Sequence, residues 1–242
     1  MSAKNSGVDY GMDQLFITAG LCVDQCYGSK VMLVIFDCDG VLIDSERIVN
    51  QAFSECLAQL GLQLTLEETI YHFKGHTTEV CIVMAEQMLG KPIDVDALLK
   101  NYKILSNGRM ENELQAIPGV VDVVANLSYP KCVASNSGHR HLKMGLEQTG
   151  LMPYFAPNVF SAKDVARPKP APDLFLHAAK TMGFDPKDCV VVEDSPAGVT
   201  GAIAAGMQVL GFADLTPASV LQDAGACTFD SMQELPALLE TI

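Results

Sequence analysis

The sequence lacks long hydrophobic runs, and basic residues are scarce in it. No apolar run reaches the roughly 18 residues that a membrane-spanning helix needs. Residues 1–30 have no basic start followed by a long apolar stretch, so we expect no signal peptide. The chain has 16 Lys and Arg against 29 Asp and Glu, a net charge of −13. Because no basic stripe is visible, we expect no nucleic-acid or membrane partner.

Cys-x-x-Cys pairs are also absent, although the chain contains eight cysteines. They are scattered, and several lie inside apolar runs, as Cys132 and Cys189 do. Cysteines of this kind are usually reduced and buried, where they behave as small hydrophobic side chains. We therefore expect a cytoplasmic protein without a disulfide framework.

Internal repeats and low-complexity segments are missing as well. A length of 242 residues corresponds to one or two domains, at about 150 residues per domain. An apolar fraction of 49% with 19% charged residues is typical of a globular protein with a large core. Because nothing indicates a partner chain, we expect a monomer.

What the sequence does contain is a repeated pattern of a strand followed by a helix. Four apolar runs without alternation, which favour parallel strands buried on both faces, occupy residues 31–36, 131–134, 189–192 and 207–211. Three helical patterns, each followed by a glycine that ends it, occupy residues 138–149, 172–182 and 196–205. This order predicts an α/β protein with a doubly wound parallel sheet.

One long segment between the first two runs interrupts this pattern, because residues 46–115 read almost wholly as helix. Apolar residues recur at three- and four-residue spacing from Ile48 onward, and Thr65 with Glu68 fits a capping box. The pattern predicts a helical domain over 46–115, inserted into a core formed by 31–45 and 116–242.

Residues 1–30 are weakly patterned, and we expect them to form an N-terminal extension. A further hypothesis is that Met32 is the natural start of the chain.

Polar residues gather at the ends of the predicted strands, where open α/β sheets bind their ligands. Carboxylates follow two of these strands, a Ser-Asn pair follows another, and a lysine lies in a Pro-rich loop: Asp37, Asp39, Ser135, Asn136, Lys169, Glu193 and Asp194. Carboxylates gathered at one site repel one another unless a cation joins them, and hard oxygen ligands of this kind suit Mg²⁺.

These groups form a chemically coherent set for phosphoryl transfer. Asp37 would be the nucleophile and would form an aspartyl-phosphate. Asp39 is placed to act as general acid and then as general base. Lys169 would balance charge, while the Ser135 hydroxyl and the following backbone N–H, that of Asn136, would bind phosphate oxygens.

Four motifs, in order along the chain, resemble the signatures of the haloacid dehalogenase superfamily. They are Asp-Cys-Asp-Gly-Val at 37–41, Val-Ala-Ser-Asn at 133–136, Lys169 within Arg-Pro-Lys-Pro-Ala-Pro-Asp, and Glu-Asp-Ser-Pro-Ala-Gly at 193–198. The resemblance covers residues 32–235. It implies a Rossmann-like core, and the helical insertion is similar to the cap domain of the β-phosphoglucomutase-like branch.

The resemblance also implies the roles of the site residues. Mg²⁺ would be held by the Asp37 carboxylate, the Asp39 backbone carbonyl and Asp194, while Glu193 assists directly or through water. The substrate would be a small phosphorylated metabolite, and the cap would select it.

Within this superfamily, dehalogenation and phosphonate cleavage are two other reactions to consider. Haloacid dehalogenases need no Mg²⁺ and lack the second aspartate of the signature, so Asp39 argues against them. Phosphonatases use a cap lysine as a Schiff base, a role for which Lys74, Lys100 and Lys103 are available but otherwise unsupported.

A sugar phosphomutase is the third alternative. β-Phosphoglucomutases carry a histidine twelve residues after the nucleophile, where this sequence has Val49. They also carry a cap arginine soon after a Lys-Gly pair, but residues 76–78, which follow Lys74-Gly75, contain none. A hydrolytic phosphatase therefore fits best. A protein of this fold that binds phosphorylated ligands without turnover is the alternative from another class.

The predicted cap loop Phe-Lys-Gly-His at 73–76 should face the crevice, so Lys74 could attract a second anionic group of the substrate. This loop and residues 113–119 together look similar to the 6-phosphogluconate phosphatase-like members of the superfamily. The histidines do not pair with cysteines at metal-ligand spacing, and we interpret most of them as surface or helix-face residues: His72, His76, His139, His141 and His177.

Overall fold

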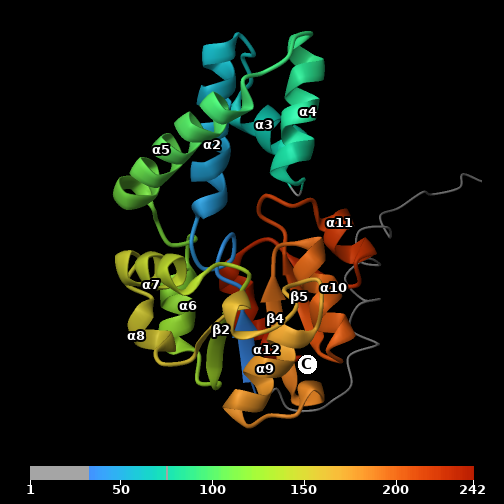
Figure 1. Cartoon of the computed structure of the whole chain (residues 1–242). Helices are drawn as coiled ribbons and strands as arrows, with labels where there is room; N and C mark the ends of the chain where they lie inside the picture. Colours follow the sequence, from blue (N-terminus) through green and yellow to red (C-terminus); the bar gives the residue numbers. More distant parts are fainter. Residues whose placement is uncertain (1–32, 75) are drawn as a thin grey trace, which may run out of the picture.

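The computed structural model describes residues 33–74 and 76–242, which Figure 1 shows in sequence colours. The extension expected over 1–30 and the start hypothesised at Met32 lie outside the described residues. In the described part of the chain, no helix is both long and apolar enough to cross a membrane.

A parallel sheet of six strands forms the lower part of the molecule in Figure 1. The strands run in the spatial order β3-β2-β1-β4-β5-β6. Their bounds are Leu33–Phe36 (β1), Lys131–Ser135 (β2), Val159–Ser161 (β3), Cys189–Glu193 (β4), Gln208–Phe212 (β5) and Cys227–Phe229 (β6). From β1 the chain adds β2 and β3 on one side of the sheet and then β4, β5 and β6 on the other, so the direction of strand addition reverses at β1. The predicted doubly wound α/β sheet is therefore confirmed.

The two outermost strands, β3 and β6, are additions to the strands predicted from sequence. Each has three residues, so neither produces an apolar run that stands out from the surrounding loops. The central strands are different, because every residue of β1 and β4 is buried. Burial on both faces is the reason why these strands read as continuous apolar runs.

Alternate residues of β1 face two separate hydrophobic cores. Val34 and Phe36 pack with the helices on one face, which are α6 (Val120–Asn126), α7 (His139–Gln148), α8 (Met152–Phe155) and α12 (Leu235–Glu240). Leu33 and Ile35 pack with those on the other, α9 (Asp173–Met182), α10 (Pro196–Ala204) and α11 (Ala218–Asp223). Short 3-10 turns lie at Ala162–Asp164, Pro186–Asp188 and Met232–Glu234. The sheet is therefore covered on both faces.

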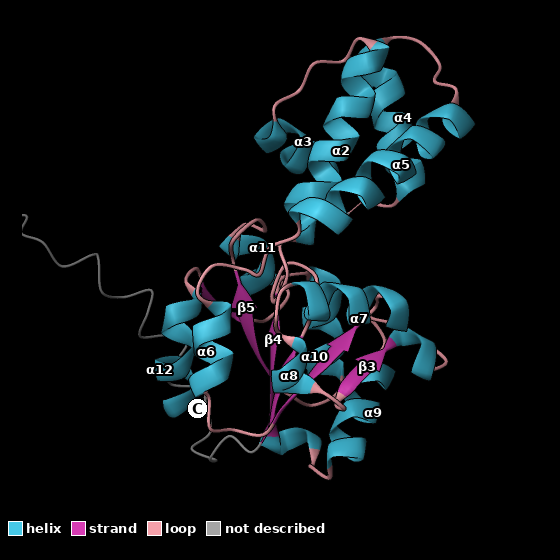
Figure 2. Cartoon of the chain, turned by 90° about the vertical axis from the view of Figure 1, so that its left-hand side faces the viewer, coloured by secondary structure: helices cyan, strands magenta, loops and turns pink. Residues whose placement is uncertain are grey.

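Four helices between β1 and β2 form a second body, which Figure 2 shows above the upper ends of the strands. They are α2 (Ser45–Leu60), α3 (Leu66–Phe73), α4 (Thr78–Leu89) and α5 (Val95–Glu113). We refer to them as the cap. Leu57 and Ala85 are fully buried in a hydrophobic cluster that belongs to the cap alone. The predicted capping box is present, because the Glu68 N–H donates to the Thr65 side chain and the Thr65 N–H to the Glu68 carboxylate.

Two adjacent segments connect the cap to the core. The Asp44 N–H donates to the Gln115 carbonyl oxygen at 2.9 Å, and the Ile117 N–H donates to the Leu42 carbonyl oxygen at 3.0 Å. These bonds tie the segment that enters the cap to the segment that leaves it. The division between 31–45 with 116–242 and 46–115 remains our proposal for the domains. It agrees with helix bounds at Ser45 and Glu113 to within one and two residues.

The cap cluster predicts a stability difference between two positions of α2. Leu57 is 0% exposed, so Leu57→Ala should lower the free energy of unfolding by about 2–5 kcal/mol through lost burial and a cavity. Gln59→Ala, on the exposed side of the same helix, should change it by no more than about 0.5 kcal/mol. Chemical denaturation measures both values. Equal stability of the two variants would contradict the packing of this cluster.

Candidate active site

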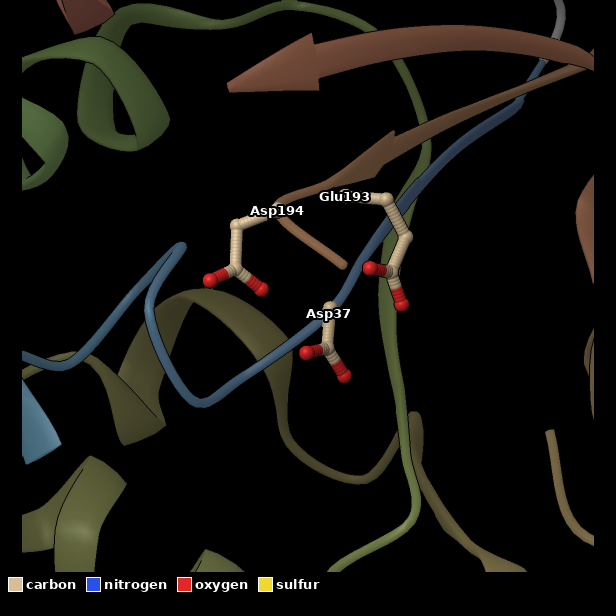
Figure 3. Close-up of side chains that lie close together, drawn as sticks. All are labelled: Asp37, Glu193 and Asp194. Carbon is tan, nitrogen blue, oxygen red and sulfur yellow. The ribbon is translucent and has the colours of Figure 1, made fainter. Parts of the chain in front are cut away.

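Asp37 follows β1 directly at the edge of the sheet that faces the cap. Its backbone N–H donates to the Val192 carbonyl oxygen at 2.9 Å, which continues the pairing with β4 by one residue. The residue is 7% exposed. Figure 3 shows its carboxylate beside those of Glu193 and Asp194, which lie at the end of β4. The first and fourth strands thus bring three carboxylates to the point where the strand order reverses.

Lys169 bridges two of these carboxylates. Its Nζ lies 2.7 Å from an Asp37 oxygen and 2.7 Å from a Glu193 oxygen. The lysine is buried, and its ammonium also lies over the ring of Phe175, 4.8 Å from the centroid. A buried cation between two buried anions satisfies charges that would each be costly alone.

Asn136 holds the backbone of this lysine in place. Its side-chain oxygen accepts a hydrogen bond from the Lys169 N–H at 2.9 Å, and its amide donates to the Lys169 carbonyl oxygen at 3.2 Å. The Asn136 side chain therefore positions Lys169 in this structure, whereas its contact with a substrate stays a prediction. Neighbouring Ser135 ends β2, and its hydroxyl oxygen accepts a hydrogen bond from the Ser137 N–H.

The start of α10 fixes the Glu193 side chain. Its second oxygen accepts hydrogen bonds from the Ser195 N–H at 2.9 Å and the Ser195 hydroxyl at 2.8 Å. Ser195 also caps the helix, since its Oγ accepts a hydrogen bond from the Gly198 N–H. A Cβ at Gly198 would lie 1.7 Å from a Glu193 oxygen, so only glycine leaves room for this carboxylate.

Asp194 points toward the cap. Its carboxylate lies 3.0 Å from the Nζ of Lys74, which follows helix α3. On the core side it packs against Gly40, whose φ is 79° and whose Cβ, if present, would lie 2.3 Å from an Asp194 oxygen. Asp37, Glu193 and Asp194 can each offer an oxygen within 4.8 Å of the others. The site therefore collects three hard ligands around one point.

Burial and mutual repulsion dominate the electrostatics. Burial raises the pKa of Asp37 well above its usual value, and Glu193 and Asp194 raise it further, although Lys169 opposes them. Burial likewise raises the pKa of Asp194 to about 7, with Lys74 opposing. Burial alone would lower the pKa of Lys169, but the carboxylates of Asp37 and Glu193 raise it above its usual value. A cation at this point would favour the ionised carboxylates.

Asp39 stands apart from this cluster. Its carboxylate accepts hydrogen bonds from the hydroxyls of Ser45 and Ser137, both at 2.6 Å, and lies 2.8 Å from Nε2 of His141. Burial alone would raise the pKa of Asp39, but the hydrogen bonds from His141 and the two serines lower it. The hydrogen bond to Asp39 in turn raises the pKa of His141.

His141 is the functional candidate that sequence reasoning missed. We interpreted most histidines as surface or helix-face residues, and His141 does lie on a helix, α7. Its partner, however, lies 102 positions away in the sequence, so no local spacing links the two. The sequence offered one signal for it. Helix α7 begins soon after Ser135, at the end of β2, so the first turn of α7 lies at the edge of the sheet where Asp37 and Asp39 follow β1.

Comparison with known families agrees with this geometry. Residues 34–212 match the model of a family described as haloacid dehalogenase-like hydrolases. The chain belongs to this haloacid dehalogenase-like hydrolase family. The matched range includes Asp37, Lys169, Glu193 and Asp194, and it confirms the family expected from the four motifs.

Known members of the family match most of this chain. A 6-phosphogluconate phosphatase from Escherichia coli strain K12 is 31% identical over 210 residues, which cover 87% of this chain and 95% of the relative. A crystal structure of a haloacid dehalogenase-like protein of unknown function from Agrobacterium tumefaciens is 42% identical, with a TM-score of 0.81, and covers 86% of this chain and 97% of that one.

A second crystal structure, of a hydrolase of this family from Deinococcus radiodurans, contains bound phosphate and sodium. It is 31% identical with a TM-score of 0.80, and the match covers 88% of this chain and 97% of that one. The prediction of an enzyme that hydrolyses phosphate monoesters is therefore confirmed.

Because the Lys169 ammonium pairs with two buried carboxylates, we predict that replacing Lys169 lowers the stability of the protein by an amount that depends on pH. Lys169→Met leaves two buried carboxylates without their partner, so the free energy of unfolding at pH 7 should fall by about 3–5 kcal/mol. The folded-state pKa of Asp37 is already raised, and losing Lys169 raises it further, so stability falls as the pH rises through that pKa. The loss should therefore be smaller at pH 5 than at pH 7.

Denaturant titrations at the two pH values measure this effect, with the exposed Lys180→Met as the matched control. The control should keep the stability of the wild type at both pH values. An equal loss for Lys169→Met at pH 5 and pH 7 would contradict the electrostatic origin of the effect.

Proposed function

We propose that this protein is a magnesium-dependent phosphatase that hydrolyses a small sugar phosphate through an aspartyl-phosphate on Asp37. The observation that carries the proposal is the position of the Asp37 carboxylate. One oxygen lies 2.7 Å from the Lys169 ammonium, and the carboxylate can offer an oxygen within 4.8 Å of Glu193 and Asp194. A carboxylate held between a cation and a metal-binding group is suited to attack a phosphorus atom.

The chemistry proceeds in two steps. An oxygen of Asp37 attacks phosphorus and forms a new P–O bond, while the P–O bond to the leaving alcohol breaks. Because its present hydrogen bonds keep Asp39 ionised, it must first take up a proton, which the neighbouring His141 can supply. It then gives that proton to the leaving oxygen and later takes one from the water that hydrolyses the aspartyl-phosphate. Lys169 balances the negative charge of the phosphoryl group, and Ser135 with the N–H of Asn136 binds its oxygens. During this cycle Asp39 must exchange its present partners, Ser45, Ser137 and His141, for the reacting oxygens.

The donor set suits Mg²⁺, which prefers carboxylate and carbonyl oxygen. Both Glu193 oxygens already accept hydrogen bonds, from Lys169 and from Ser195. We therefore assign direct contact to the carboxylates of Asp37 and Asp194 and to the Asp39 carbonyl oxygen, with Glu193 acting through water. When bound, the ion neutralises phosphate charge and orients the group for in-line transfer.

For the substrate, 6-phosphogluconate is one candidate within the sugar phosphates. It is the substrate in the name of the Escherichia coli relative, which covers most of this chain. Lys74 supports the candidate, because it lies at the junction of cap and core and lines the cap pocket. If Asp194 served as a ligand of Mg²⁺, the Lys74 ammonium that now lies 3.0 Å from it would be available to a substrate carboxylate.

A phosphomutase is the second candidate, and the cap pocket disfavours it. Val49 lines this pocket at the position where mutases carry a histidine, and no arginine is among the described residues that line it. The non-catalytic ligand-binding alternative is disfavoured by the complete set of reacting groups.

We also propose that the protein acts as a cytoplasmic monomer without nucleic-acid or membrane partners. The described cysteines include buried thiols such as Cys38, Cys132 and Cys189, which suit a reducing compartment. Burial raises the pKa of each of these three thiols, so they stay protonated and unreactive.

The proposal predicts Mg²⁺-dependent hydrolysis that requires Asp37. A panel of sugar phosphates should release inorganic phosphate with Mg²⁺ and not after chelation, and Asp37→Asn should lose at least about 10³-fold in kcat because the nucleophile is gone. Asp223→Asn, an exposed aspartate of α11, is the matched control and should keep wild-type rates. Isomerisation without release would favour the mutase, and binding without turnover would favour the ligand-binding protein.

Magnesium affinity itself should respond in opposite directions to two substitutions. Asp194→Asn removes a charged ligand and should weaken Mg²⁺ binding by at least about tenfold. Lys74→Met removes the ammonium that lies 3.0 Å from Asp194, so Mg²⁺ should bind more tightly. Calorimetric titration of substrate-free protein measures both, with the exposed cap residue variant Lys91→Met as control. Weaker Mg²⁺ binding in Lys74→Met would contradict the proposed competition between Lys74 and the ion for Asp194, and unchanged binding in Asp194→Asn would show that the ion does not use this carboxylate.

A further inference from the structure

The cap contains a pocket whose role the proposed reaction leaves open. Among the residues that line it are Glu46, Asn50, Phe53, Lys74 and Tyr102. Lys74 belongs both to this pocket and to the catalytic cluster, through its contact with Asp194. The pocket therefore adjoins the catalytic cluster at Lys74, and the residues that line it belong to the cap.

Glu46 is the acidic group of this pocket, and its hydrogen-bonding capacity is largely unused. It lies in the first turn of α2 and is partly buried. The hydrogen bond found for its carboxylate comes from the Asn50 amide and is long, at 3.4 Å. The same amide donates to the Glu46 backbone oxygen at 2.8 Å, and Asn50 is 7% exposed, so it holds this turn firmly. An ionised carboxylate can accept about four hydrogen bonds.

The neighbouring cations are committed to other anions. Arg47, the next residue, pairs with Asp44 and Asp214 at 2.9 and 3.0 Å. Lys74 pairs with Asp194. Within 33–74 and 76–242, no Lys, Arg or His nitrogen lies within ion-pair distance of the Glu46 carboxylate. Burial raises the pKa of Glu46, although the charge of the nearby Lys74 ammonium opposes this shift.

Aromatic side chains form another wall of the pocket. The ring of Phe53 contacts the rings of Phe73 and Tyr102 edge to face, with centroids 5.1 and 5.9 Å apart. Aromatic rings of this kind can pack against the C–H groups of a carbohydrate, while a nearby acceptor takes its hydroxyl protons. The Glu46 carboxylate and this apolar wall together suit a polyhydroxylated group better than a plain alkyl chain.

We propose that Glu46, held by Asn50, accepts hydrogen bonds from hydroxyl groups of the leaving group and so selects polyhydroxylated phosphate esters over esters without hydroxyls. The inference rests on the proposed phosphatase function and assigns the part of that function that chooses the substrate. An ester without hydroxyls leaves the Glu46 carboxylate desolvated and unpaired, and sites built to bind a hydroxyl discriminate strongly against analogues that lack it.

The test compares two esters with the same carbon chain, a hexitol 6-phosphate and hexyl phosphate. The quantity measured is the ratio of their kcat/KM values, since an effect on the phosphoryl centre changes both esters and cancels in the ratio. Wild-type enzyme should favour the hexitol ester by about 100-fold or more. Glu46→Ala should reduce the ratio at least tenfold, and Glu46→Gln, which keeps one acceptor, should lie between. Gln51→Ala, exposed on the same helix, should keep the wild-type ratio.

The outcomes separate this inference from the function on which it rests. If wild-type enzyme hydrolyses both esters with a ratio near one, the phosphatase stands and the inference is overturned. If the ratio is high but unchanged in both Glu46 variants, the inference is also overturned, since another residue reads the hydroxyls. If neither ester nor any member of the sugar phosphate panel is hydrolysed, the proposed function fails and the inference falls with it.

Discussion

The buried ion triad of Lys169, Asp37 and Glu193 is the interaction on which the rest of the site depends. The ammonium lies 2.7 Å from an oxygen of each carboxylate, and all three residues are buried. Three separate segments of the core must meet for this contact, namely the ends of β1 and β4 and the loop that Asn136 holds. In the proposed mechanism, the same charge balance that permits burial also holds the Asp37 carboxylate ready to act as the nucleophile.

A residue of the cap, Lys74, adds to the charged groups of the core site. Lys74 links the end of α3 to Asp194, and the pocket that Lys74 lines leads to Glu46 and Asn50. In the proposed mechanism the core supplies the reacting groups, and the cap supplies the side chains around the leaving group. The proposal therefore expects substitutions in the cap pocket to change the substrate preference without changing the reaction.

Most of the core could be predicted from sequence because buried parallel strands end abruptly at charged residues. The run before Asp37 and the run before Asp194 identify the two strand ends that meet. Strands β3 and β6 were missed because three residues give no pattern. The contacts of His141 with Asp39 and of Lys74 with Asp194 join residues more than 100 positions apart, so only the folded chain brings them together.

The most direct test of the central claim is to trap the phosphoryl group on the enzyme. Wild-type protein is mixed with Mg²⁺ and a hexitol phosphate, quenched in acid within one turnover, digested, and analysed by mass spectrometry. Nucleophilic attack by Asp37 predicts one phosphoryl group on the peptide that contains Asp37, localised by fragmentation to that residue rather than to Asp39. Phosphate release in solution with an unmodified peptide at every quench time would contradict the covalent route.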